Sequence, residues 1–97
     1  MRIISRKMLR GFYHQHPDAK APLDAWFREA RKGEWTSPLD VKVLHGTASI
    51  LKNNRVIFNI GGNKYRLVVW INYRKKIIYI RYVGTHREYD KINAEEI

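Results

Sequence analysis

The sequence predicts an α+β domain in which two N-terminal helices pack on one face of a small antiparallel sheet. Three observations lead to this prediction. The first half of the chain contains two apolar stripes at helical spacing, residues 53–91 read as three successive strands joined by tight turns, and residues 1–4 add a short β-branched strand. With 97 residues the chain is long enough for one core and too short for two independent domains, so residues 1–97 should form a single domain.

The two helices should follow the short N-terminal strand, which is long enough only for an edge or side position. Ser5 is a candidate N-cap for a helix over residues 6–15, and Pro17 discourages its continuation. The apolar face of this helix is formed by Met8, Leu9 and Phe12. A second helix should begin between residues 18 and 22 and end before Gly33. Its apolar stripe consists of Leu23, Trp26, Phe27 and Ala30.

A third, short helix is predicted between the helical pair and the sheet. Ser37-Pro38-Leu39-Asp40 resembles a capping box with proline at the first helical position, and Gly46 would end the helix. This helix start explains Asp40 without a catalytic role.

The sheet is predicted from residues 56–60 and 65–71, which are rich in β-branched and aromatic side chains, and from a third strand after a turn near Arg74-Lys75. A two-residue turn at Gly61-Gly62 would place Phe58 opposite Tyr65, and the second turn would place Ile71 opposite Ile78. In this register one apolar face should receive the helices. Its residues are Val56, Phe58, Ile60, Tyr65, Leu67, Val69, Ile71, Ile78, Ile80 and Tyr82.

The opposite face of the predicted sheet mixes apolar and basic side chains. It would carry Ile57, Asn59, Lys64, Arg66, Val68, Trp70, Ile77, Tyr79, Arg81 and Val83. Val68 would lie opposite Arg81, which brings Arg66 and Arg81 close together. The two guanidinium groups either splay into water or bind one anion between them, for which arginine is suited. Trp70 and Tyr79 are either packing residues or platforms for stacked bases.

The charge of the chain favours nucleic acid as a partner. Lys and Arg number 19 against nine Asp and Glu, which gives a net charge of +10, and no acidic residue occurs between Asp40 and Glu88. A basic surface that serves only solubility is the alternative, but ten cations fall inside this acid-free stretch. The residues predicted to bind RNA are Lys52, Arg55, Asn59, Lys64, Arg74, Lys75, Lys76 and Arg87.

The chain lacks the residues that several classes of enzyme chemistry usually require. The chain has no cysteine, no Gly-rich phosphate loop and no clustered carboxylates, and His14 and His16 have no carboxylate to complete a metal site. We therefore expect neither a metal nor a cofactor. The apolar runs are only a few residues long, so a cytoplasmic protein without a membrane span is expected.

Acid-base chemistry assisted by cations remains, and such chemistry can cleave RNA. The ribose 2′-OH attacks the adjacent phosphate, a base accepts its proton, an acid protonates the leaving 5′-oxygen, and a cation stabilises the transition state. His86 lies at the end of the last predicted strand, three residues before Tyr89, and histidine suits proton transfer. The candidate catalytic residues are Arg66, Arg81, His86 and Tyr89. The remaining histidines, His14, His16 and His45, read as capping or surface residues.

The segments NNRVIFNIGGNKYRLVV and IRYVGTHREYDKI, with WTSPLDVK before them, resemble the HigB group of toxins from bacterial toxin-antitoxin systems, within the RelE/ParE superfamily. The resemblance covers nearly the whole chain. It implies a RelE-like fold, cleavage of mRNA, typically in the ribosomal A site, and neutralisation by a helix-turn-helix antitoxin of the HigA type. DNA would be contacted only through that antitoxin.

The resemblance also implies roles for individual residues. Arg66 resembles the strand arginine that holds the scissile phosphate, whereas Arg81 is a weaker match. His86 occupies the place of a proton-transfer residue, and Tyr89 resembles a tyrosine used near the 2′-OH, with the choice of acid and base left open. The paired catalytic lysines of another branch have no clear counterpart, unless Lys52 or Lys64 serves.

Two other functions are compatible with the same scaffold. A ParE-like inhibitor of DNA gyrase shares the fold without cleaving RNA, and a noncatalytic module that binds RNA or the ribosome would need only the basic face. His86 and Tyr89 favour the nuclease.

Overall fold

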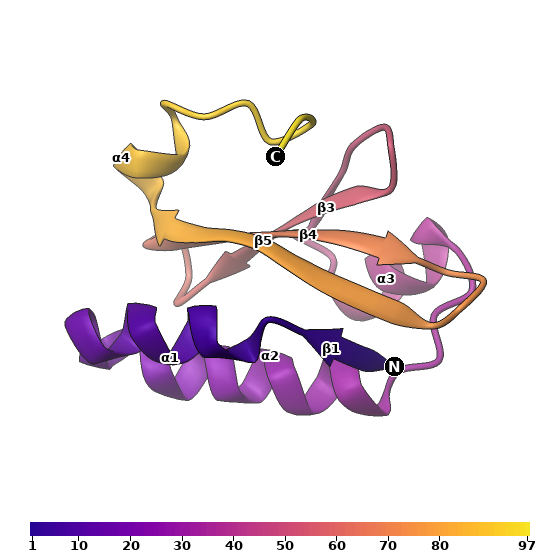
Figure 1. Cartoon of the computed structure of the whole chain (residues 1–97), viewed down its shortest axis with the longest axis horizontal. Helices are drawn as coiled ribbons and strands as arrows, with labels where there is room; N and C mark the ends of the chain where they lie inside the picture. Colours follow the sequence, from indigo (N-terminus) through magenta and orange to yellow (C-terminus); the bar gives the residue numbers. More distant parts are fainter.

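A five-stranded mixed sheet forms the centre of the computed structural model, which describes residues 1–97. The elements in chain order are β1 (Arg2–Ile4), α1 (Arg6–Gln15), the 3-10 turn η1 (Pro17–Ala19), α2 (Lys20–Lys32), α3 (Pro38–Leu44), β2 (Ser49–Ile50), β3 (Arg55–Ile60), β4 (Tyr65–Asn72), β5 (Ile77–Thr85) and α4 (His86–Tyr89). The strand order is β1-β5-β4-β3-β2. Figure 1 shows α1 and α2 together on one side of the sheet, with α4 and the C-terminal residues on the other. The predicted α+β architecture, with both N-terminal helices on one face, is confirmed.

The sheet differs from the prediction at its two edges. β1 pairs with β5 in the parallel direction, whereas all other pairs are antiparallel. The strand β2 was not predicted, because two residues are too few to show an alternating pattern.

The helices α1 and α2 span the residues that were predicted from their apolar stripes. Ser5 precedes α1 but caps it with no side-chain hydrogen bond, and its φ is 77°. η1 leads directly into α2. The side chains that α2 buries in the core are Leu23, Trp26 and Ala30. No helix of the structure combines the length and the apolarity that a membrane crossing requires.

The start of α3 is stabilised by a different contact from the predicted capping box. Pro38 is the first helical residue as expected, but the Ser37 side chain makes no capping bond. Asp40 Oδ2 instead accepts hydrogen bonds from the backbone N–H and the hydroxyl of Thr36, at 2.8 and 2.9 Å. These bonds hold the pKa of Asp40 below its ordinary value. The structural role of Asp40 is thus supported, with Thr36 as its partner.

The hairpin between β3 and β4 is longer than predicted. Ile60 pairs with Tyr65 and Phe58 with Leu67, so residues 61–64 form a four-residue turn in which both glycines have positive φ. The predicted pairing of Phe58 with Tyr65 is therefore wrong by two residues. Because side chains alternate with a period of two, this shift leaves the side chains within β3 and β4 on their predicted faces, whereas Lys64 lies in the turn instead of on the sheet.

The pairing of β4 with β5 contains a bulge between Val68 and Val69. Ile71 pairs with Ile78 as predicted, but beyond the bulge Val68 pairs with Tyr82 instead of Arg81. Tyr82 therefore packs on the face away from the helices and Val83 packs against the main core, so the predicted faces of both residues are wrong.

A glycine makes room for the Tyr82 ring. A Cβ atom at Gly84 would lie 2.5 Å from the Tyr82 hydroxyl oxygen and 2.8 Å from its ring carbon Cζ, which is closer than packed atoms approach. The position of the Tyr82 ring thus requires the absence of a side chain two residues further along β5.

Two apolar clusters lie on opposite sides of the sheet. The larger one joins the helices to the inner face and includes Leu23, Phe58 and Leu67. The smaller one lies on the outer face, by which we mean the sheet face away from α1 and α2. It is built from Ile57, Val68 and Ala94, with Leu51, Tyr82, Tyr89, Ile92 and Ile97 packed around them. The C-terminal segment, residues 90–97, therefore covers part of a face that the sequence pattern left open (Figure 1).

We expect the substitution Gly84→Ala to lower the free energy of unfolding by about 1–3 kcal/mol, because the added methyl group forces the Tyr82 ring to move. Urea denaturation checks this value. Gly11→Ala is the matched control: its added methyl group meets no atom within 4 Å, and it should raise stability by about 0.5–1 kcal/mol. Equal stability of the Gly84→Ala protein and the wild type would contradict the role given to Gly84.

Candidate functional site

The end of the sheet where β5 runs into α4 gathers three of the four predicted catalytic residues. Arg66 comes from the start of β4, and His86 and Tyr89 come from α4 (Figure 1). The backbone N–H of His86 donates to the Lys64 carbonyl at 3.0 Å, which joins the start of α4 to the β3–β4 turn.

A capping box starts α4 immediately after β5. Thr85 Oγ1 accepts from the Glu88 N–H at 3.1 Å, and Glu88 Oε1 accepts from the Thr85 N–H at 2.9 Å. These bonds hold the pKa of Glu88 below its ordinary value. The T-x-x-E spacing is a readable helix-start signal that our sequence prediction did not use.

Arg66 is the only charged residue that the fold buries, with 8% of its surface exposed. Its Nη2 donates to Asn63 Oδ1 at 2.7 Å, and its Nη1 donates to the carbonyls of Asn63 and Tyr65 at 3.2 Å. No carboxylate forms an ion pair with it, and its Nε makes no hydrogen bond within the chain. Asn63 thus fixes one edge of the guanidinium, and the Nε edge is left for an external acceptor.

A buried charge that meets only neutral acceptors is costly unless an ion of opposite sign binds there. The planar fork of arginine matches the two oxygens of a phosphate or carboxylate. The geometry around Arg66 is therefore chemically suited to bind an anion. Asn63 belongs to this site but was not predicted, because its contact with Arg66 depends on the four-residue turn.

Tyr89 lies close enough to Arg66 for their charges to interact. Burial raises the pKa of the Tyr89 hydroxyl, while the Arg66 guanidinium acts in the opposite direction and lowers it. Since the net shift is upward, Tyr89 stays protonated at neutral pH and can donate a hydrogen bond or a proton beside the anion site.

His86 is exposed at the start of α4. Its Nδ1 lies 3.5 Å from Asp90 Oδ2, one helical turn further on. A carboxylate at this position can orient an imidazole ring. Asp90 was not among the predicted site residues, although the i, i+4 spacing of His86 and Asp90 is visible in the sequence.

Arg81 does not join this group in the predicted way. The bulge leaves Arg81 without a paired residue on β4 and exposed to solvent, so the predicted placement opposite Val68 is wrong. No carboxylate lies within ion-pair distance of Arg81.

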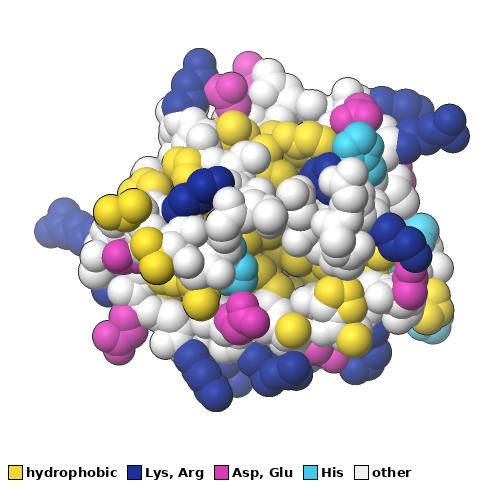
Figure 2. All heavy atoms as spheres, turned by 180° about the vertical axis from the view of Figure 1, so that it is seen from behind, with side chains coloured by type: hydrophobic (Ala, Val, Ile, Leu, Met, Phe, Trp, Pro, Cys, Tyr) yellow, Lys and Arg dark blue, Asp and Glu magenta, His cyan; other side chains and the backbone are white.

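The eight residues predicted to bind RNA are not gathered in one patch. Arg87 lies on α4, while Arg74, Lys75 and Lys76 follow β4 at the other end of the sheet (Figure 1). Asn59 lies on β3 and contacts the Thr47 carbonyl at 3.5 Å. Figure 2 shows Lys and Arg side chains mostly along the rim of the molecule, with acidic side chains between them. The basic residues therefore surround the fold instead of forming a single stripe.

Several of these cations already have partners within the chain. Lys64 forms an ion pair with Asp18 at 2.6 Å, and its hydrogen bond is the main cause that lowers the pKa of Asp18. Lys52 pairs with Glu95 at 3.2 Å. Arg55 donates to the Ile97 carbonyl from Nε at 3.1 Å and from Nη2 at 2.7 Å, which fastens the C-terminal segment to β3.

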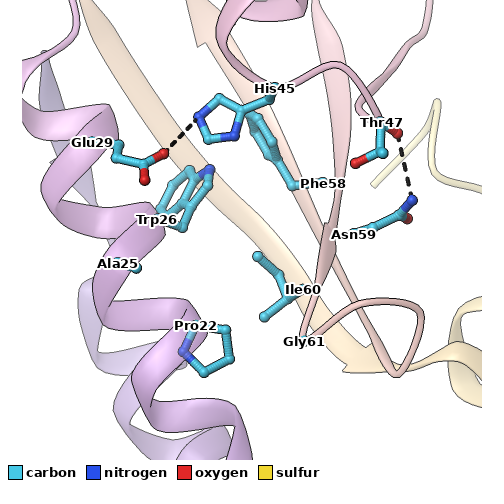
Figure 3. A pocket seen from close by; sticks show the side chains of 10 residues that line it. All are labelled: Pro22, Ala25, Trp26, Glu29, His45, Thr47, Phe58, Asn59, Ile60 and Gly61. Carbon is cyan, nitrogen blue, oxygen red and sulfur yellow. Dashed lines mark hydrogen bonds and ion pairs between the residues drawn. The ribbon is translucent and has the colours of Figure 1, made fainter.

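A separate hollow of about 210 Å³ lies between α2 and β3, on the inner side of the sheet (Figure 3). Trp26 Nε1 and His45 Nε2 are buried beside it without a hydrogen-bond partner, and Glu29 Oε2 lies 3.4 Å from His45 Nε2. His45 stands at the C-cap of α3, one of its two predicted roles, but only 17% of its side chain is exposed, so the alternative of a surface residue is wrong. Its ring packs against Trp35 and Phe58.

Burial lowers the pKa of His45, and the weaker attraction of Glu29 only partly opposes this. Above the unfolded-state pKa, near 6.5, His45 is neutral in both states. As pH falls below that value, the unfolded chain binds a proton that the folded chain resists, so stability should fall until the lower folded-state pKa is reached.

We expect His45→Phe to flatten the pH dependence of the free energy of unfolding between about pH 7 and pH 5. Urea denaturation across this range measures the slope. His14→Gln, a change at an exposed histidine of α1, is the control and should keep the wild-type slope. An unchanged slope in His45→Phe would show that His45 is not the titrating group.

Comparison with known proteins identifies the family. Residues 19–92 match the family HigB_toxin, described as the RelE-like toxic component of a toxin-antitoxin system. The mRNA interferase toxin HigB of Escherichia coli K12 is 31% identical over 96 residues, which cover 97% of this chain and 92% of that protein, and the mRNA interferase HigB of Shigella flexneri gives the same values. A second mRNA interferase HigB, from Escherichia coli O6:H1, is 23% identical over 94 residues, or 95% of this chain and 91% of its own length. The chain belongs to the HigB family of RelE-like toxins from toxin-antitoxin systems.

Proposed function

We propose that this protein is the toxin of a type II toxin-antitoxin system and acts as an mRNA interferase, an endoribonuclease that needs no metal. Its relatives named mRNA interferase HigB support the activity. The observation that carries the proposal is the buried guanidinium of Arg66, which has no carboxylate partner and whose Nε makes no hydrogen bond within the chain.

Arg66 binds the scissile phosphate in this proposal. Two N–H groups of the Nε edge donate to two phosphate oxygens, and the positive charge stabilises the extra negative charge of the pentacoordinate transition state. The charge acts strongly there because the guanidinium is largely removed from water. Asn63 keeps the plane of the guanidinium fixed, so no reorganisation is needed during the reaction.

His86 and Tyr89 transfer the protons. Tyr89 is protonated at neutral pH and serves as hydrogen-bond or proton donor on the Arg66 side of the phosphate. His86 accepts the proton of the attacking 2′-OH, and Asp90 stabilises the imidazolium that forms. Attack of the 2′-oxygen forms a bond to phosphorus, the bond to the 5′-oxygen breaks, and Tyr89 gives its proton to that leaving oxygen. The products are a 2′,3′-cyclic phosphate and a 5′-hydroxyl, and Tyr89 regains a proton from solvent while His86 releases one.

Arg81 and the other cations bind the RNA backbone without taking part in bond cleavage. The exposed position of Arg81 on the bulge suits this role. The proposed partners are mRNA, the ribosome that presents it and a helix-turn-helix antitoxin, all of which would be met in the cytoplasm.

We expect Arg66→Gln to lower the rate of mRNA cleavage on translating ribosomes by about 10²–10³-fold, the loss typical of removing a group that stabilises an oxyanion. Arg66→Lys should recover only part of the rate, since lysine keeps the charge but not the two-pronged contact. His86→Gln should also reduce cleavage strongly. Mapping of mRNA 5′ ends during translation in vitro measures all of these rates.

Arg10→Gln is the control, because Arg10 is an exposed cation of α1 on the other side of the sheet. Its cleavage pattern should match that of the wild type. Identical mRNA ends with the wild type and with Arg66→Gln would overturn the proposal. Inhibition of gyrase supercoiling without any mRNA cleavage would instead support the ParE-like alternative.

A further inference from the structure

Two aromatic side chains lie paired on the outer face, outside the smaller apolar cluster that includes residues of the C-terminal segment. The C-terminal segment ends near them, because Arg55, which binds the Ile97 carbonyl, is the β3 partner of Trp70. Trp70 of β4 and Tyr79 of β5 are direct cross-strand partners, with ring centroids 4.9 Å apart and ring planes at 35°. Both side chains are partly exposed. Trp70 lies on the same face of β4 as Arg66, because the residues between them alternate from face to face.

Packing alone does not account for this pair. Neither ring belongs to the main core or to the smaller cluster on the outer face, although most other large aromatic side chains of the chain do. A cross-strand aromatic pair stabilises a sheet, but that contribution does not require both rings to keep part of their surface in water. The pair therefore offers an aromatic surface with no partner inside the chain.

Exposed cations surround the aromatic pair. Arg81 follows Tyr79 by two residues on β5, Arg2 lies on the neighbouring strand β1, and Arg74 and Lys75 form the turn beyond Trp70. All four side chains are exposed, and none has a carboxylate within ion-pair distance. Aromatic rings flanked by unpaired cations on an open sheet face are the combination that binds single-stranded nucleic acid, because the rings stack on bases and the cations hold phosphates.

We propose that Trp70 and Tyr79 form a binding site for an unpaired base of the RNA. This base belongs to the same RNA chain as the scissile phosphate at Arg66. Trp70 is four residues from Arg66 along β4, which corresponds to ~13 Å, a span of a few nucleotides. Arg81 lies between the two positions along β5 and holds an intervening phosphate. The choice of RNA as the ligand rests on the proposed function.

Tryptophan fluorescence provides a direct test, because Trp70 differs from the other two tryptophans in exposure. Trp26 and Trp35 are 3% and 4% exposed, whereas Trp70 is partly open to solvent. The probe is a short single-stranded RNA whose 2′-hydroxyls are methylated, so that it binds without being cleaved. Binding should quench the emission, and Trp70→Phe should bind similarly while losing most of the quenching.

Loss of the aromatic surface should weaken binding of the same RNA. We expect Trp70→Leu and Tyr79→Leu each to raise the Kd about tenfold, the size typical of one stacked base. Arg81→Gln should reduce the salt dependence of the Kd by about one phosphate contact. Tyr13→Leu, which removes a partly exposed aromatic ring of α1 on the inner side, is the control and should leave the Kd unchanged.

The outcomes separate this site from the proposed nuclease. Wild-type affinity in both leucine variants, with their folding verified by circular dichroism, would overturn the base site while leaving mRNA cleavage intact. Equal affinity for a double-stranded RNA would also overturn it, because paired bases cannot stack on the rings. If RNA quenches Trp70 but no mRNA is cleaved, the base site stands and the nuclease proposal fails.

Discussion

The buried charge of Arg66 is the constraint on which the rest of the site depends. The fold places this guanidinium at the sheet surface with 8% exposure and gives it only neutral oxygen acceptors from Asn63 and Tyr65. These acceptors satisfy its hydrogen bonds without cancelling its charge. This arrangement is suited to the anion binding proposed for Arg66, because the side chain is held in a fixed orientation in advance. The four-residue turn between β3 and β4 makes this possible, because it brings Asn63 back over β4.

The outer face of the sheet is divided between two roles. The bulge at Val68 turns Tyr82 toward this face, and Tyr82 joins Tyr89 and the C-terminal segment in the smaller apolar cluster. This cluster, together with the contact between Arg55 and the Ile97 carbonyl, fixes α4 beside Arg66. The other half of the face carries Trp70 and Tyr79, which lie outside this cluster and are partly exposed. One half thus positions the groups proposed for catalysis, and the other half is the proposed site for a base.

The sequence was sufficient to predict the elements whose pattern is periodic and local. α1, α2, the three main strands and the inner face followed from apolar spacing, and the faces were unaffected by the hairpin error because the shift was an even number of residues. The bulge was not predictable from spacing, and neither was the fit of the Tyr82 ring over Gly84. The C-terminal segment has no periodic pattern, so its packing on Ile57 and Val68 could not be foreseen.

In the candidate site, too, residues in local patterns were predictable, whereas contacts that depend on the exact register were not. Arg66, His86 and Tyr89 were predicted as site residues from strand alternation and from the family resemblance, and the structure places them at one end of the sheet. The placement of Arg81 beside Arg66 failed because it depended on an unbroken register across the bulge. Asn63 was missed because its contact with Arg66 arises only from the true length of the turn.

The most direct measurement of the central claim is the NMR signal of the Arg66 Nε–H group, assigned by its absence from an Arg66→Lys protein. Because the Nε edge is held in place and has no acceptor within the chain, inorganic phosphate and the methylated RNA should both shift this signal, with little change in the signals of Arg10 or Arg28 on the helices. A shift confined to Arg66 and saturating with phosphate is the predicted result. An Arg66 signal that does not respond while RNA binds elsewhere would contradict the account.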